Sequence, residues 1–366
     1  MKWNEFFREN IQPMQPYQPG LREEQVREIA EVETIYKLSS NESPLPPFPS
    51  ALAAISDKLA CLNEYPDGSC HELTQTIARH YQVPPEQVLL GNGSNELIDL
   101  IAQTCLQPGD EVLYCWPSFV VYRSSVQIAA ARSVELPLTS DGRFDLTALL
   151  AAVTPRTKLL FLCTPNNPTG TALGAEELAE FLDAVPDHLL VVIDAAYEEF
   201  ITGPDTARPL VHFDGERPLA VLRTFSKIYG LAGIRMGYGL APAPLVETVN
   251  KVREPFNVNT LAQAACAACL GDEAELAHRR QLNAEGRQRL YGCFEQLGLP
   301  FFRSEGNAVW VEVADPQAAF NDLLRQGIIV RPFAGACGLR VGVGDEAGVT
   351  ATIEVFQKLF SQPFGG

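Results

Sequence analysis

The sequence has few basic residues. Its 366 residues include 28 lysines and arginines against 45 aspartates and glutamates, which gives a formal net charge of −17. Nucleic acids and anionic membrane surfaces are bound by clustered Lys and Arg, so this balance argues against both as partners. An anionic small molecule would need a local group of arginines inside an otherwise acidic protein.

The sequence also lacks a long apolar run. No stretch reaches the ~20 residues of a membrane-spanning helix, and the residues from Met1 to Glu5 contain no apolar signal core. The nine cysteines are odd in number and scattered, mostly in apolar runs typical of reduced core residues. Cys266-x-x-Cys269 has no second pair, which favours core packing over metal or redox chemistry. We expect a soluble cytoplasmic protein without a metal site.

The composition, 46% hydrophobic and 20% charged, is that of a globular protein, and the length favours two domains. Apolar strand patterns alternate with helical ones along most of the chain, which predicts an α/β fold. We expect a large domain with a mostly parallel sheet covered by helices on both faces, and a smaller α+β domain. The predicted divisions are an N-terminal arm with part of the small domain (1–35), a large ligand-binding domain (36–260) and a small C-terminal domain (261–366).

Hydrophobic periodicity places the main elements of this fold. Strands are expected over 36–38, 87–90, 111–115, 157–163, 188–194, 219–223, 308–313, 328–331 and 339–343. Helices are expected over 25–29, 50–62 with Ser50 as its cap, 71–81, 91–105, 118–129, 175–184, 261–297 with a bend near Gly271, 316–326 and 346–359.

The most informative stretch runs from Leu222 to Gly237, Leu-Arg-Thr-Phe-Ser-Lys-Ile-Tyr-Gly-Leu-Ala-Gly-Ile-Arg-Met-Gly. Lys227 follows a buried strand, where desolvation lowers the pKa of an amine and makes it a nucleophile for carbonyls. Ser226 and Arg235 are donors suited to a phosphate, and the glycines permit close backbone approach. The alternative is a surface lysine after a strand.

Other polar residues follow predicted strands at the same edge of the sheet. They are Asn167 in an Asn-Pro-Thr-Gly turn, then Asp194 and Tyr197 in Asp-Ala-Ala-Tyr. Ligands of parallel sheets bind at this edge. Ser94 and Asn95 begin a helix after a strand and a Gly-rich turn, which predicts an anion site. Taken singly, Asp194 could cap a helix, Tyr197 could be a core aromatic and Asn167 could occupy an ordinary turn.

A lysine, an aspartate and a phosphate-binding helix start suit one ligand, pyridoxal 5′-phosphate, which has a carbonyl, a ring nitrogen and a phosphate. The sequence resembles the fold-type I pyridoxal-phosphate aminotransferases, and among them the histidinol-phosphate aminotransferases. The resemblance extends from Tyr17-Gln18-Pro19-Gly20 to Leu339-Arg340-Val341-Gly342-Val343-Gly344 and thus covers nearly the whole chain.

The resemblance implies a role for each of these residues. Lys227 would hold the cofactor as a Schiff base and move the proton, while Asp194 would pair with the pyridine nitrogen. Asn167 and Tyr197 would bond the ring hydroxyl oxygen, and Phe119 would stack on the ring. The phosphate would be held by Ser94, Asn95, Ser226 and Arg235, and by Tyr65 of a neighbouring subunit, which implies a homodimer.

On the substrate side, the resemblance implies that Arg340 binds a carboxylate and that Tyr17 and Arg331 help to hold a substrate phosphate. The expected reaction is amino-group transfer between L-histidinol phosphate and 2-oxoglutarate, giving imidazole-acetol phosphate and L-glutamate, in histidine biosynthesis. An aromatic amino-acid aminotransferase is the main alternative, since a flat ring suits either pocket. A phosphoamino-acid decarboxylase is more distant. A ligand-sensing domain of a transcription regulator would need an attached basic DNA-binding domain.

Overall fold

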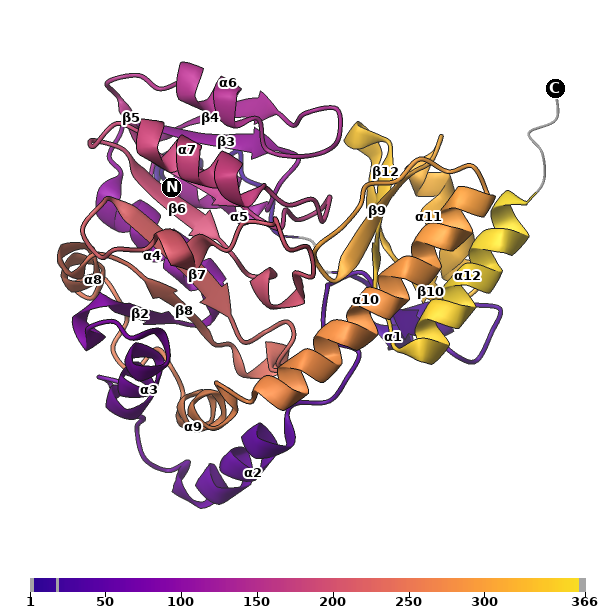
Figure 1. The fold of residues 1–366 in the computed structure, drawn as a ribbon, viewed down its shortest axis with the longest axis horizontal. Helices are drawn as coiled ribbons and strands as arrows, with labels where there is room; N and C mark the ends of the chain where they lie inside the picture. Colours follow the sequence, from indigo (N-terminus) through magenta and orange to yellow (C-terminus); the bar gives the residue numbers. More distant parts are fainter. Residues whose placement is uncertain (1–2, 18–19, 362–366) are drawn as a thin grey trace.

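The computed structural model describes residues 3–17 and 20–361. A large unit is built on a seven-stranded sheet, and a smaller unit contains the C-terminal helices (Figure 1). The strand order of the large sheet is β2-β8-β7-β6-β5-β3-β4. In chain order the strands are β2 (Val88–Gly91), β3 (Glu111–Trp116), β4 (Arg132–Pro137), β5 (Thr157–Cys163), β6 (Leu190–Asp194), β7 (Leu219–Thr224) and β8 (Gly237–Leu240).

The large sheet is mostly parallel, which confirms the predicted fold class. The strands from β4 through β3, β5 and β6 to β7 pair in parallel. In this sheet β8 runs antiparallel, between β7 and β2. The sequence analysis did not predict β8 or β4, and in β8 glycines interrupt the apolar pattern of a buried strand. The carboxyl ends of the parallel strands meet at one edge of the sheet, where ligands of such folds bind.

Helices cover both faces of this sheet (Figure 1). Leu89 packs in a cluster with side chains of α4 to α8, whereas Val88 and Leu90 pack with those of α2, α3 and α9. This alternation is the period of two expected for a strand buried on both faces. The helices are α2 (Pro49–Lys58), α3 (His71–Tyr81), α4 (Gly93–Cys105), α5 (Val121–Ile128), α6 (Leu146–Ala151), α7 (Ala175–Ala184), α8 (Ala243–Val249) and α9 (Thr260–Cys269).

The smaller unit has an antiparallel sheet of order β11-β12-β9 covered by helices. β1, near the N-terminus, pairs in parallel with β10, so an early segment belongs to the fold of this unit. The elements are α1 (Glu23–Arg27), β1 (Tyr36–Lys37), α10 (Glu273–Gln296), β9 (Ala308–Glu312), α11 (Pro316–Arg325), β10 (Ile328–Ile329), β11 (Arg331–Phe333), β12 (Gly338–Gly342) and α12 (Glu346–Phe360).

Several predicted elements match closely and a few predictions are wrong. The helices at 71–81 and 175–184 and the strand at 157–163 have the predicted bounds. Ser50 does not cap α2, because the helix begins at Pro49 and the Ser50 hydroxyl is buried without a hydrogen bond. The strand at 328–331 is two short strands. Short 3₁₀ helices lie at Trp3–Glu5, Leu59–Cys61, Pro85–Gln87, Glu198–Phe200, Pro209–His212, Ala232–Ile234 and Ala334–Ala336.

The predicted helix over 261–297 is two separate helices, α9 and α10. Through Ala262 and Ala265, α9 packs in the cluster of the large unit, beside α2 and α3. The later part of α10 packs through Leu290 and Phe294 in the core of the smaller unit. We propose from this packing that the second domain begins near Gly271 and not at residue 261.

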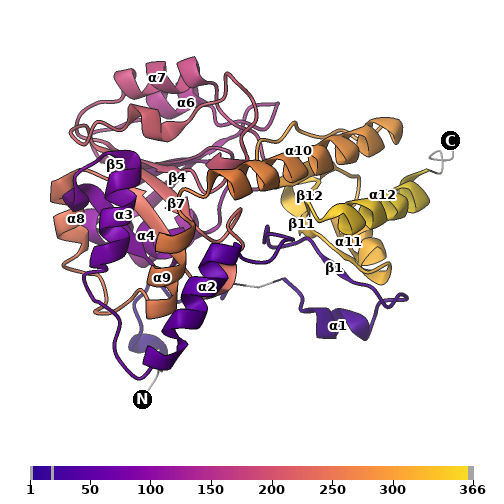
Figure 2. The same cartoon turned by 60° about the horizontal axis from the view of Figure 1, so that its bottom comes forward.

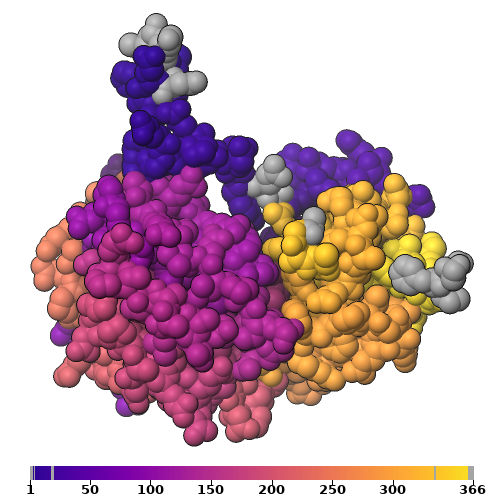
Figure 3. Space-filling view, turned by 90° about the horizontal axis from the view of Figure 1, so that it is seen from above, coloured from indigo at the N-terminus to yellow at the C-terminus, as the bar shows by residue number. Residues whose placement is uncertain are grey.

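The N-terminal residues connect the two units. Arg8 donates a hydrogen bond to the Ile128 carbonyl and Asn10 donates one to Gln127, at 2.5 and 2.6 Å. Of the described residues, those from Trp3 to Phe7 project from the body as an arm (Figure 3). Further along, α1 lies against the smaller unit (Figure 2), where Val26 packs on Leu324. None of the helices within residues 3–17 and 20–361 is long and apolar enough to cross a membrane.

Candidate active site

A cavity of about 200 Å³ lies at the carboxyl ends of β6 and β7. It brings together side chains from the large sheet, from α4, from the N-terminal segment and from β12. Except for Tyr65 and Arg331, every predicted site residue lines it: Tyr17, Ser94, Asn95, Phe119, Asn167, Asp194, Tyr197, Ser226, Lys227, Arg235 and Arg340. Residues far apart in sequence meet here because the parallel strands end at this edge.

Lys227 has the properties of a nucleophilic amine. Its Nζ lies 3.4 Å from the Ser40 carbonyl oxygen and 5.6 Å from the centre of the Tyr197 ring. Burial, reinforced by the nearby charge of Arg340, lowers the pKa of Lys227 from 10.5 to about 8. The unprotonated amine, which attack on a carbonyl requires, is therefore far more populated near neutral pH than in an ordinary lysine.

Asp194 is the carboxylate of the cavity. It accepts hydrogen bonds from the Tyr122 hydroxyl at 3.0 Å and from the Ala196 backbone N–H at 3.1 Å. Burial raises the pKa of Asp194 above its ordinary value, although both hydrogen bonds act in the opposite direction. A buried carboxylate of this kind is suited to a cationic ring N–H, which would supply the missing counter-charge.

Arg340 comes from the smaller unit and Tyr197 from the large one, and both line the cavity. Arg340, from β12, donates hydrogen bonds to the Asn167 side chain and to the Ser39 carbonyl. Its Nε is buried without a hydrogen bond. The Tyr197 hydroxyl accepts a hydrogen bond from the Asn41 amide at 3.0 Å. A guanidinium with an unsatisfied N–H beside the cavity can bind an anionic ligand.

An anion cradle, formed by Gly93, Ser94, Asn95, Ser226 and Arg235, surrounds the start of α4. The first-turn N–H groups of a helix have no partner within the helix and favour an anion. Arg235 Nη1 lies 3.4 Å from the Ser226 hydroxyl, and a Cβ on Gly93 would lie 2.5 Å from Arg235 Nη2. Gly93 has φ +79°, a backbone angle that favours glycine, and a side chain there would displace the Arg235 guanidinium from the cradle. This donor set fits a phosphate, and Lys227 and Asp194 fit the carbonyl and ring nitrogen of pyridoxal phosphate.

Phe119 lines the cavity and contacts Tyr122 edge-on, with ring centres 5.8 Å apart. Tyr122 in turn stacks on Phe161. These contacts fix Phe119 beside Asp194, where its face can cover a flat ligand.

Tyr65 and Arg331 lie outside the cavity wall. Tyr65 is 83% exposed and stacks on Phe256, with ring centres 4.8 Å apart. Arg331 pairs with Arg340 across β11 and β12. Burial lowers the pKa of Arg340, and the charge of Arg331 lowers it further. Tyr17, 71% exposed, reaches the cavity from the N-terminal segment.

Three residues near the reacting groups were missed by the sequence analysis. Tyr122 bonds Asp194, Asn41 bonds Tyr197, and Ser40 contacts Lys227. Tyr122 is three residues after Phe119, a spacing that favours a shared face, and this was an available signal. The loop from Ser39 to Ser43 showed only an irregular polar pattern, which does not specify contacts.

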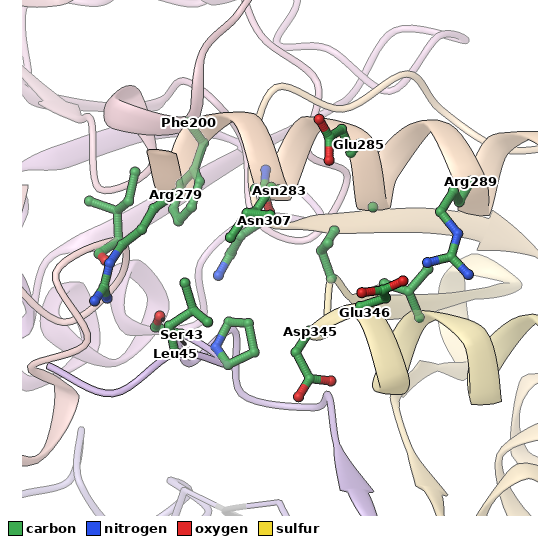
Figure 4. A pocket seen from close by; sticks show the side chains of 17 residues that line it. Ser43, Leu45, Phe200, Arg279, Asn283, Glu285, Arg289, Asn307, Asp345 and Glu346 are labelled. Atoms are coloured by element: carbon green, nitrogen blue, oxygen red, sulfur yellow. Dashed lines mark hydrogen bonds between the residues drawn. The ribbon is translucent and has the colours of Figure 1, made fainter. Parts of the chain in front are cut away.

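A second cavity, of about 490 Å³, lies between α10, α12 and the loop at Ser43 and Leu45 (Figure 4). Its wall contains apolar side chains, the amides of Asn283 and Asn307 and the charged side chains of Arg279, Glu285, Arg289, Asp345 and Glu346, but none of the predicted site residues. Size therefore does not identify the active site in this protein. The smaller cavity is distinguished by a buried amine and a buried carboxylate, Lys227 and Asp194, whose pKa values are both shifted.

A desolvated amine, a buried carboxylate and an anion cradle in one cavity define an enzyme site for amine–carbonyl chemistry. The family model for aminotransferase class I and II matches residues 33–356. The chain belongs to this family.

Individual relatives agree with this assignment. The chain is 42% identical to a histidinol-phosphate aminotransferase of Moorella thermoacetica, over 92% of this chain and 88% of that protein. It is also 42% identical to an aromatic amino acid aminotransferase of Thermobifida fusca, over 93% of each. The crystal structure of histidinol-phosphate aminotransferase from Sinorhizobium meliloti in complex with pyridoxal-5′-phosphate has a TM-score of 0.87, at 29% identity, with 96% of this chain and 98% of that chain covered.

Proposed function

We propose that this protein is a pyridoxal-phosphate-dependent histidinol-phosphate aminotransferase. It would transfer the amino group between L-histidinol phosphate and 2-oxoglutarate, giving imidazole-acetol phosphate and L-glutamate, as a step of histidine biosynthesis. The observation that carries the proposal is the common cavity of Lys227, Asp194 and the anion cradle. Among the relatives, the histidinol-phosphate aminotransferase of Moorella thermoacetica supports the choice of substrate.

The cofactor, when bound, supplies a carbonyl for the amine and a ring that accepts electrons from the substrate carbon. Lys227 would provide the amine that holds the cofactor, and its Nζ would accept and return the proton that is moved. Asp194 would keep the ring nitrogen protonated, and Tyr122 orients the Asp194 carboxylate by donating a hydrogen bond to it. Asn167 and Tyr197 would bind the ring hydroxyl oxygen, and Phe119 would cover the ring.

Charge supports a phosphorylated substrate. Histidinol phosphate carries a dianionic phosphate and no carboxylate, whereas phenylalanine carries a carboxylate and no phosphate. Two arginines paired across adjacent strands, Arg331 and Arg340, suit a dianion. Glutamate, the second substrate, would use the same pair for its carboxylates, and Tyr17 would help to hold the substrate phosphate.

The test compares specificity constants for histidinol phosphate, phenylalanine and tyrosine in wild type and in Arg331→Ala. We expect the variant to lose roughly 2–4 kcal/mol of transition-state stabilisation, mainly with histidinol phosphate, because the charge-assisted hydrogen bonds from Arg331 to the substrate phosphate would be lost. Arg325→Ala is the matched control, since Arg325 pairs with Asp322 on the exposed face of α11. An equal loss on every substrate would show that Arg331 does not recognise phosphate.

An aromatic amino-acid aminotransferase is the second candidate. The relative in Thermobifida fusca favours it, and Arg340 alone suffices for one carboxylate. A wild-type enzyme that prefers phenylalanine or tyrosine over histidinol phosphate would establish this alternative.

We further propose a homodimer with shared sites in the cytoplasm. Exposed apolar side chains support a second copy. They are Leu59, Leu62 and Tyr65, Phe256 stacked on Tyr65, and Trp3, Phe6 and Phe7 on the arm. Tyr65 would reach the cofactor phosphate of the neighbouring subunit. The nine cysteines are all unpaired, which supports a reducing compartment. Sedimentation of the purified protein as two chains would agree with this assembly, and a monomer would contradict it.

A further inference from the structure

The segment Ser39–Asn41 contacts three groups of the active site. The Ser39 carbonyl accepts a hydrogen bond from Arg340, and the Ser40 carbonyl accepts one from Lys227. Asn41 follows directly and donates its side-chain amide to the Tyr197 hydroxyl. The segment comes from β1 of the smaller unit and leads to α2 of the large one. It is therefore placed to position the reacting groups without belonging to the cofactor-binding motifs.

The direction of the bond between Asn41 and Tyr197 has a chemical consequence. A phenolic hydroxyl has one proton to donate and can accept from other groups. Because Tyr197 accepts from Asn41, its own proton stays free for a ligand in the cavity. Burial raises the pKa of Tyr197, and the bond from Asn41 opposes this shift, which makes the hydroxyl a better donor.

Asn41 itself is firmly held. It is 4% exposed and has φ +55°, a left-handed conformation that asparagine and glycine tolerate better than other residues. Its carbonyl accepts a hydrogen bond from the Asn307 amide at 3.0 Å. Asn307 also lines the second cavity (Figure 4), so the loop at Asn41 lies between that cavity and the active site.

We propose that Asn41 is a positioning residue that polarises Tyr197 so that its hydroxyl donates to the ring oxygen of the bound cofactor. The proposal deepens the proposed function and rests on it. By donating to that oxygen, Tyr197 favours its negative form and so lowers the pH at which the cofactor bound to Lys227 loses its proton. Asn41 thus lowers the pH of this proton loss through Tyr197, without touching the cofactor itself.

The test uses the holoenzyme and the pH at which its visible absorption band changes. In Asn41→Gly, which suits the left-handed backbone but has no amide, this pH should rise by up to about one unit. In Asn41→Asp the carboxylate accepts the Tyr197 proton, so the rise should be at least as large. Tyr197→Phe should also raise the pH at which the band changes. The double variant, Tyr197→Phe with Asn41→Gly, should show no further shift.

Ser43→Ala is the matched control in the same loop, since the Ser43 hydroxyl accepts from the Leu45 backbone and should leave the pH unchanged. The proposal would be overturned if both Asn41 variants change their absorption at the wild-type pH. It would also be overturned if Asn41→Gly causes the same shift in the wild-type protein and in Tyr197→Phe. These outcomes are distinct from failure of the proposed function. A purified protein without a visible absorption band would show that it does not bind the proposed cofactor. A preference for aromatic amino acids would change the substrate assignment but would leave the spectral test valid.

Discussion

Two groups of buried charges lie close together along β6 and β7, and they differ in how the charges are paired. In the first, Arg223 forms ion pairs with Glu198 at 3.1 Å and with Glu199 at 2.8 Å. In the second, no ion pair among the described residues joins Lys227 to Asp194. The two groups share chain segments, since Arg223 precedes Lys227 by four residues.

The pKa values of the two basic side chains, Arg223 and Lys227, shift in opposite directions. Burial alone would lower the pKa of Arg223, but its two carboxylate partners raise it well above the ordinary value. In the cavity, burial prevails: it lowers the pKa of Lys227 and raises that of Asp194. Paired charges are fixed and hold the ends of the strands together, whereas poorly compensated charges are available for chemistry.

The largest effect is expected from Lys227→Ala. Turnover should fall by roughly 10⁴-fold or more, because the covalent site and the proton carrier are both lost. In the wild-type holoenzyme, borohydride reduction should fix the cofactor on the peptide that contains Lys227. Lys158→Ala, an exposed lysine on β5, is the control and should keep normal turnover. Attachment of the cofactor to another lysine would contradict the assignment.

Arg223→Met should lower the free energy of unfolding by about 3–5 kcal/mol, because two buried carboxylates lose their counter-charge. Denaturant unfolding measures this difference. The variant that also carries Glu198→Gln and Glu199→Gln should recover most of the loss, since no buried charge is left uncompensated. A loss below ~1 kcal/mol in Arg223→Met would show that this group does not hold the strands.

The comparison also shows what the sequence could predict. Apolar runs predicted the buried strands, and residues directly after them, such as Asn167, Asp194 and Lys227, were predicted to meet because parallel strands end at one edge. Contacts of Asn41 and Tyr122 depend on how a loop and a helix pack, which no local pattern encodes. The short strand β8 was missed because its glycines have no side chains to show a strand pattern.

Asp194→Ala should behave in the opposite way to Arg223→Met. Its rate should fall by roughly 10²–10³-fold, as expected when one electrostatic group of a buried site is removed. Its stability should be retained, because a poorly compensated buried carboxylate is gone. Asp194→Glu should keep more of the rate. Normal turnover in Asp194→Ala, measured beside its unfolding curve, would show that Asp194 only caps the turn before Tyr197.

The smallest effect concerns pH and the cofactor-free protein. Lys227 titrates at about 8 when folded, against its ordinary 10.5. Between these values the unfolded chain holds the proton and the folded chain does not, so this lysine makes stability rise with pH there. Below pH 8 the folded protein carries the full cost of a buried ammonium. Lys227→Met removes that cost, so the variant should be more stable than wild type at pH 7.5.

The difference between Lys227→Met and wild type should narrow by about 2–3 kcal/mol between pH 7.5 and 10, since each pKa unit corresponds to ~1.4 kcal/mol. Taking the difference cancels the titration of groups that both proteins share. Arg223 contributes no pH dependence of stability between pH 7.5 and 10, because its paired guanidinium stays charged over this range. A constant difference between the two proteins would mean that Lys227 is compensated in the folded state, and the contrast between the two groups of charges would fail.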